Sequence, residues 1–178
     1  MSHPAEMRVT YLGAFPHTVV AAVIWLASGI LGQFTSTTGT ILFFLVAGFF
    51  IFPLGEVIRK AMNIPNRLSE DNLLPMLFMW LAFTLPLSYP LIYLACRHEI
   101  RVFFSAFTIL VGAHYLPFIY GYKMPSFGML AITLVGIGTY FGLLHPEQFA
   151  IPALITGSVL LVFAFVHLLL LKRYYHER

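Results

Sequence analysis

Long apolar segments without a charged side chain follow one another along most of this chain. The first run covers residues 9–55, and later runs cover 72–96, 102–122, 124–146 and 148–171. A helix needs roughly 20 consecutive apolar residues to cross a bilayer, so the first run can hold two spans and each later run one. A membrane β-barrel would show segments of alternating hydrophobicity instead of solid apolar runs. The pattern therefore predicts six transmembrane helices.

Polar and helix-breaking residues mark the boundaries of these helices. Pro16 suits the first turn of a helix, where its missing N–H leaves no bond unmade. The polar segment 34–39 predicts a tight turn, and the segment Ser69-Glu-Asp-Asn72 offers a capping side chain and two acids for the positive end of a helix. The predicted helices cover residues of about 16–33, 40–55, 73–95, 102–122, 126–144 and 150–171. The expected fold class is all-α, a polytopic membrane bundle that occupies residues 1–178 as one domain.

The composition agrees with a membrane protein. Of the 178 residues, 60% are hydrophobic and only 10% are charged, and the mean hydropathy is +0.87. A soluble domain carries about 25% charged residues, and a disordered chain lacks such apolar content. The single cysteine, Cys96, excludes an internal disulfide and a thiolate metal site.

The basic residues are divided unequally between the two sides of a six-span chain. The calculated pI of 9.1 does not predict a nucleic-acid partner, because these residues are scattered rather than clustered. Only Arg97 and Arg101 fall on the side opposite the termini. By the positive-inside rule, both termini are expected to be cytoplasmic in a multi-pass protein of the cell membrane. The eight basic residues on the side of the termini are Arg8, Arg59, Lys60, Arg67, Lys123, Lys172, Arg173 and Arg178.

Polar and helix-disturbing residues gather near the membrane centre in the third and fourth predicted helices. Pro86 and Pro90 each remove a backbone hydrogen bond and leave a carbonyl that needs a partner. His114 lies at a similar depth in the next helix, which follows after the short loop 97–101. The two helices should therefore be antiparallel neighbours with a polar patch between them. The candidate binding residues of this midplane patch are Thr84, Pro86, Ser88, Tyr89, His114, Tyr115 and Pro117.

Two interpretations of His114 remain open. A neutral imidazole can hydrogen-bond a freed carbonyl and so hold two helices together. Ionisable residues within the membrane also commonly serve ligand or proton pathways. Substitution by glutamine or leucine separates the interpretations, because a structural role predicts a change in stability and a binding role predicts loss of ligand.

A second set of candidates lies at the cytoplasmic ends of the predicted helices. His17 lies at the start of the first predicted helix, Glu56 lies at the end of the second, and His167 lies near the end of the sixth. If these helices adjoin, two imidazoles and a carboxylate could bind a metal or handle a proton. The alternative is interfacial anchoring, with Glu56 paired to Arg59 or Lys60 at helical spacing.

Three segments resemble a family of small bacterial multi-pass membrane proteins of unknown function. They are Trp25-Leu-Ala-Ser-Gly29, Phe52-Pro-Leu-Gly-Glu56 and Val111-Gly-Ala-His-Tyr-Leu-Pro-Phe-Ile-Tyr120, the last containing Gly112, His114 and Pro117. The resemblance implies a bacterial plasma-membrane protein and supplies no activity.

The chain contains no zinc-protease, nucleophile-elbow, Walker or dinucleotide-binding motif, so no cofactor and no metal are predicted.

The favoured function is binding or transport of a small molecule or lipid at the midplane patch. The alternatives are a membrane-embedded enzyme acting on lipid-like substrates at the inner leaflet, and a non-catalytic membrane subunit. The expected partners are membrane lipid, a small-molecule ligand, a second copy of this chain or another membrane protein. Nucleic acid is not an expected partner. The two halves of the chain share no motif that would establish an inverted repeat.

Overall fold

Helices account for all the regular structure in a computed structural model of the protein, which describes the backbone of residues 1–176 and the side chains of residues 1–171. The all-α prediction is confirmed for this part of the chain. In chain order the elements are α1 (His3–Tyr11), α2 (Phe15–Leu31), α3 (Thr37–Gly48), α4 (Ile51–Ala61), α5 (Leu74–Leu87), α6 (Tyr89–Cys96), the 3₁₀ turn η1 (Ile100–Val102), α7 (Phe103–His114), α8 (Leu116–Tyr122), α9 (Ser126–Leu144) and α10 (Ala150–His176).

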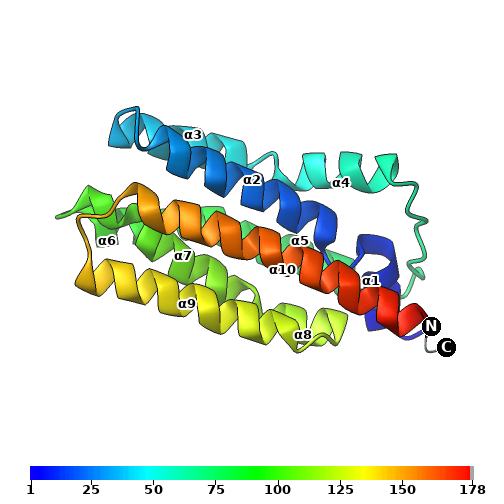
Figure 1. The fold of residues 1–178 in the computed structure, drawn as a ribbon. Helices are drawn as coiled ribbons and strands as arrows, with labels where there is room; N and C mark the ends of the chain where they lie inside the picture. Colours follow the sequence, from blue (N-terminus) through cyan, green and yellow to red (C-terminus); the bar gives the residue numbers. More distant parts are fainter. Residues whose placement is uncertain (177–178) are drawn as a thin grey trace.

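The long helices lie side by side, and the N-terminus lies at the same end of the bundle as the C-terminal end of α10 (Figure 1). The segment between α4 and α5 and the turn between α8 and α9 lie at that end as well, while the α2–α3, α6–α7 and α9–α10 connections lie at the opposite end (Figure 1). Successive connections between the six predicted helices therefore lie at alternate ends of the bundle, as the sequence predicts. Of the basic residues, Lys172 and Arg173 have side chains outside the described residues, and Arg178 lies wholly outside them.

Four continuous helical segments are long and apolar enough to cross a membrane. They are Leu74–Cys96, Ile100–Tyr122, Ser126–Leu144 and Ala150–Leu171. Two further pairs, α1 with α2 and α3 with α4, meet the same criteria together but are bent by 53° and 50°. The described residues therefore contain four candidate spans, or six if each bent pair forms one span.

The second predicted helix differs most from the structure. It was expected as one helix over about 40–55, but the chain forms α3 and α4 with a break at Phe49 and Phe50. Pro53 lacks an N–H and its ring clashes with the carbonyl four residues earlier, that of Phe49, which explains the position of the break. After the break, α4 continues past Glu56 to Ala61 and carries Arg59 at its end.

The third and fourth predicted spans are each continuous but locally irregular at one residue, where the N–H of Ser88 still bonds the Thr84 carbonyl at 3.0 Å and that of Tyr115 the Val111 carbonyl at 3.3 Å. The α5 helix ends before Ser88 and α6 begins after it, and α7 and α8 are divided in the same way at Tyr115. Pro86 and Pro90 surround the first irregularity, and Pro117 follows the second. Both irregularities lie where missing proline N–H groups weaken the helical hydrogen-bond ladder.

Close approach at glycines holds the centre of the bundle together. A Cβ at Gly157 of α10 would lie 2.8 Å from the Leu26 side chain of α2, and one at Gly138 of α9 would lie 2.5 Å from the Ser105 carbonyl of α7. Such contacts require a residue without a side chain, because backbones can then pack directly against each other. Large fully buried side chains fill the remaining core, among them Phe104, Phe127, Leu130, Leu134 and Leu160.

Candidate functional site

The midplane patch joins α5 and α7 through one backbone carbonyl. The imidazole of His114 interacts with the carbonyl of Leu81, and the Thr84 hydroxyl donates to the same carbonyl at 2.6 Å. The Ser88 hydroxyl donates to the Thr84 carbonyl at 2.7 Å. Nδ1 of His114 is buried and has no hydrogen-bond partner among the described residues. The structure therefore places three predicted patch residues close to Leu81 and Thr84 of α5, with Nδ1 of His114 buried and without a hydrogen bond in the described part of the chain.

The other predicted patch residues point to different neighbours. Tyr89 packs against Phe107 of α7, with ring centroids 6.0 Å apart. Tyr115 is 7% exposed, and its hydroxyl interacts with the Thr18 side chain of α2 rather than with α5. Pro86 and Pro117 lie beside the irregularities. Tyr115 thus connects the patch to the interior of the bundle.

Two of the three residues predicted at the cytoplasmic ends of the helices lie together. Nε2 of His17 and Oε1 of Glu56 are 3.5 Å apart, and both atoms are buried without a hydrogen bond. The other carboxylate oxygen of Glu56 accepts from Nε and Nη2 of Arg59 at 2.9 and 2.8 Å. Gly55 makes room for this contact, because a Cβ there would overlap the His17 ring. Chemically, the facing nitrogen and oxygen can share a proton.

Aromatic side chains from α1 and α8 surround this pair. The Tyr11 ring lies 5.9 Å from the His17 ring, and the Arg59 guanidinium lies 6.0 Å from the Tyr11 centroid. Tyr122 is buried within electrostatic range of Tyr11 and Glu56. These five residues, Tyr11, His17, Glu56, Arg59 and Tyr122, form what we call the inner polar cluster.

His167 occupies a different environment. It is fully buried in α10, with its ring 4.1 Å from Phe127 and 6.0 Å from Phe163, and both ring nitrogens lack a hydrogen-bond partner among the described residues. Over the part of the chain with described side chains, no three His, Cys, Asp or Glu residues are grouped so as to hold a metal. The structure therefore joins His17 to Glu56 and places His167 among aromatic rings.

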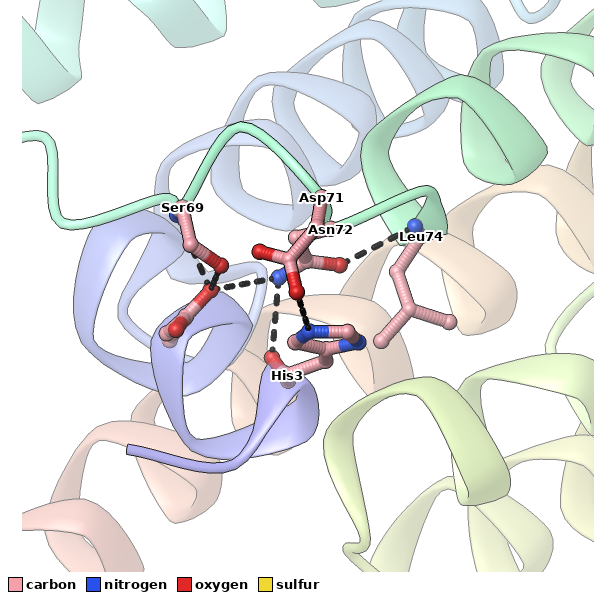
Figure 2. Close-up of polar contacts among 6 residues, drawn as sticks. His3, Ser69, Asp71, Asn72 and Leu74 are labelled. Atoms are coloured by element: carbon pink, nitrogen blue, oxygen red, sulfur yellow. Dashed lines mark hydrogen bonds and ion pairs between the residues drawn. The ribbon is translucent and has the colours of Figure 1, made fainter.

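A polar network that the sequence analysis missed fastens α1 to the segment before α5 (Figure 2). Oε2 of Glu6 accepts from the backbone N–H of Ser69 at 3.1 Å, from its hydroxyl at 2.8 Å and from Nδ2 of Asn72 at 2.8 Å. Oδ1 of Asn72 accepts from the backbone N–H of Leu74, the first residue of α5, at 3.1 Å. His3 and Asp71 form a further contact of 3.3 Å. We call this network, Glu6 with His3, Ser69, Asp71 and Asn72, the N-terminal latch.

Hydrogen bonding determines the charge state of the latch. The backbone N–H of Ser69, followed by the Asn72 side chain, holds the pKa of Glu6 below its ordinary value, although burial opposes this shift. Glu6 is only 5% exposed, so its carboxylate depends on these donors for solvation. Glu6 is an acid inside a short polar helix, and its burial depends on residues more than 60 positions away. The local sequence carried no signal of it.

A bundle of helices that are long and apolar enough to cross a bilayer is the architecture of an integral membrane protein. Residues 4–170 match a family described as "Family of unknown function (DUF7010)", and the chain belongs to this family. The resemblance to an uncharacterised family, inferred from the sequence, is therefore confirmed. Searches of curated proteins and of solved structures find no match.

Proposed function

We propose that this protein is a six-span protein of the cell membrane that binds and transports a small molecule at the midplane patch. In this proposal each bent pair, α1 with α2 and α3 with α4, provides one span, with α1 lying at the membrane interface. Both termini are cytoplasmic, because basic residues are concentrated at the end of the bundle that carries the N-terminus and the C-terminal end of α10.

The irregularities of two neighbouring spans support a binding role. Transporters commonly bind substrate near the bilayer midplane, where discontinuous helices expose backbone groups in a lipid-free interior. Here α5/α6 and α7/α8 are irregular at Ser88 and Tyr115, beside prolines that lack an N–H, on two spans that contact each other. The observation that carries the proposal is the buried, unpartnered Nδ1 of His114 beside α5. A buried polar atom without a partner is costly, so a ligand that hydrogen-bonds it gains affinity.

Buried polar residues continue from the patch toward the cytoplasmic end. Tyr115 interacts with Thr18, and Tyr122 follows two turns later beside Tyr11 and Glu56. The inner polar cluster therefore provides polar groups between the patch and the interface. An enzyme that uses His17, Glu56 and His167 jointly is less well supported, since only the first two are in contact.

A ligand screen tests the binding role. The purified chain in detergent is heated with a panel of small organic cations, carboxylates and sugars, and the same panel is applied to His114→Gln and His114→Leu. We expect a compound that raises the Tm of the wild type to have no effect on either variant. Ser158→Ala provides the control, because Ser158 is an exposed residue of α10 whose hydroxyl bonds only its own helix. A compound that stabilises all four proteins equally, or a panel without any stabilising compound, would contradict the proposal.

Cysteine labelling tests the orientation. Cys96 is replaced by serine, and single cysteines are introduced at Ser2 and at Glu147, which lie near opposite ends of the bundle. In intact cells a membrane-impermeant maleimide should label the cysteine at position 147 and not the one at position 2. The reverse pattern would place the termini outside.

A further inference from the structure

An open groove of about 380 Å³ separates α1 from the chain that follows α4. Most of its wall is apolar, and Arg67 contributes the only charged side chain among the lining residues. The groove lies at the end of the bundle that carries the N-terminus. The residues that line it are Val9, Leu12, Met62, Asn63, Ile64, Pro65 and Arg67.

Hydrogen bonds hold the two walls in place. The backbone N–H of Arg67 donates to the Thr10 hydroxyl of α1 at 3.1 Å, and Nη1 of Arg59 donates to the Ile64 carbonyl at 3.4 Å. Immediately beyond the groove, Ser69 and Asn72 are fastened to Glu6 by the N-terminal latch (Figure 2). The groove is therefore preorganised, which reduces the entropy lost when a ligand binds.

The charge at the groove is available to a ligand. The Arg67 guanidinium makes no hydrogen bond or ion pair within the part of the chain whose side chains are described; of the acids in this region, Glu6 and Asp71 are engaged in the latch and Glu70 is exposed. Lys60, on the last turn of α4, is also exposed at this end of the bundle. The groove thus combines apolar walls with free positive charge.

We propose that this groove binds the headgroup and glycerol region of an anionic phospholipid from the adjacent leaflet. Basic residues beside membrane helices attract anionic lipid headgroups, and apolar walls at the interface favour the first part of the acyl chains. The volume is at the lower end of that found for small-molecule sites, which suits a headgroup better than a whole lipid. The acyl chains extend from the open side of the groove into the bilayer.

Lipid binding to the intact, detergent-purified chain tests this site. Native mass spectrometry compares the binding of phosphatidylglycerol, phosphatidylcholine and water-soluble glycerol phosphate to the wild type, Arg67→Gln and Arg67→Lys. Arg97→Gln is the matched control, because Arg97 is also exposed but lies at the opposite end of the bundle. Met62→Gln tests the apolar wall without a change in charge.

We expect the wild type to prefer phosphatidylglycerol to phosphatidylcholine, and Arg67→Gln to weaken phosphatidylglycerol binding about fivefold. Arg67→Lys should keep most of the affinity, Met62→Gln should lower it, and Arg97→Gln should leave it unchanged. Equal losses in Arg67→Gln and Arg97→Gln would show a general charge effect and overturn the site. Glycerol phosphate binding as tightly as the lipid would identify a soluble phosphate-ester site instead.

Phosphatidylglycerol binding at the groove does not depend on the function proposed for the midplane patch. His114→Gln leaves the groove intact and should bind phosphatidylglycerol as the wild type does. Loss of lipid binding in Arg67→Gln together with an unchanged response to midplane ligands would separate the two sites.

Discussion

Two regions of the bundle are held together in different ways. In the pairs α2/α10 and α7/α9, backbones approach each other at glycines, including Gly29 with Leu154 and Gly112 with Ala131. In contrast, α5 has no buried residue and α6 buries only Ile92. The span α5/α6 depends on ring contacts, such as Phe78 with Phe118 at 4.5 Å, and on the interaction of His114 with a backbone carbonyl.

The difference follows from the physics of helix association in lipid. Lipid tails are as apolar as leucine side chains, so close packing and interhelical hydrogen bonds, rather than burial from water, hold helices together. The glycine-packed pairs form a rigid frame by this criterion. The α5/α6 span packs on the frame mainly through side chains, such as the Phe78 ring against Gly121 of α8, and buries few of its own residues.

Overpacking of the frame should have the largest effect. In Gly138→Ala the new Cβ would lie 2.5 Å from the Ser105 carbonyl and 2.9 Å from the Ile109 nitrogen, so two backbones must separate. We expect a loss of about 2–3 kcal/mol in unfolding free energy, measured by reversible unfolding in mixed micelles. Gly136→Ala in the same helix is the control, because no atom lies within 4 Å of its Cβ. Similar losses in both variants would show that α7 and α9 are not closely packed.

The tie between α5 and α7 should contribute less. Replacement of His114 by leucine removes its interaction with the Leu81 carbonyl, and we expect a loss of about 1–2 kcal/mol. His114→Gln can keep a donor at this position and should lose clearly less. Equal stability of the wild type and the leucine variant in the same unfolding measurement would mean that His114 does not hold α5/α6.

A buried hydroxyl pair within the frame sharpens the comparison. The Thr108 and Thr156 hydroxyls lie 2.9 Å apart between α7 and α10, and Thr108 also donates to the Phe104 carbonyl. Thr156→Val should therefore lower the unfolding free energy by about 1 kcal/mol. Thr133→Val on α9 serves as the control, because Thr133 is exposed and should change stability by less than about 0.5 kcal/mol. A larger loss at Thr133 would contradict the packing described for α9.

The N-terminal latch should show the smallest effect on the whole bundle, and a local one. Because the folded-state pKa of Glu6 is below its ordinary value, its stabilising effect is present at neutral pH and is lost as the pH falls through the lowered pKa. Acidification should therefore lower the protection factors of the α1 amides in the wild type, that is, the intrinsic exchange rate at each pH divided by the observed rate. Glu6→Gln should show faster exchange already at neutral pH and less dependence on pH. Glu70→Gln, an exposed acid in the same segment, should behave as the wild type. Equal exchange in both variants would exclude a latch.

The sequence was sufficient for the apolar helices and for the positions where two of them are irregular. Their signals are local: runs of about 20 apolar residues, and prolines such as Pro86 and Pro117 that act on carbonyls four residues away. The sequence did not predict the break at Phe49, although Pro53 lies four residues after it. The apolar run continues through the break, and no polar residue marks its position.

Only the tertiary structure decided which polar groups meet. His17 and Glu56 were candidates in the sequence, yet their 3.5 Å contact depends on the packing of α2 against Gly55 of α4. The same packing leaves His167 among aromatic rings, and the fold brings Glu6 to Ser69, 63 residues later. The physical reason is range: hydrophobicity and proline geometry act within a helical turn or along one helix, whereas a polar contact between helices depends on their rotation and depth. Those variables are set by side-chain packing across the whole bundle, and no single segment of the chain encodes them.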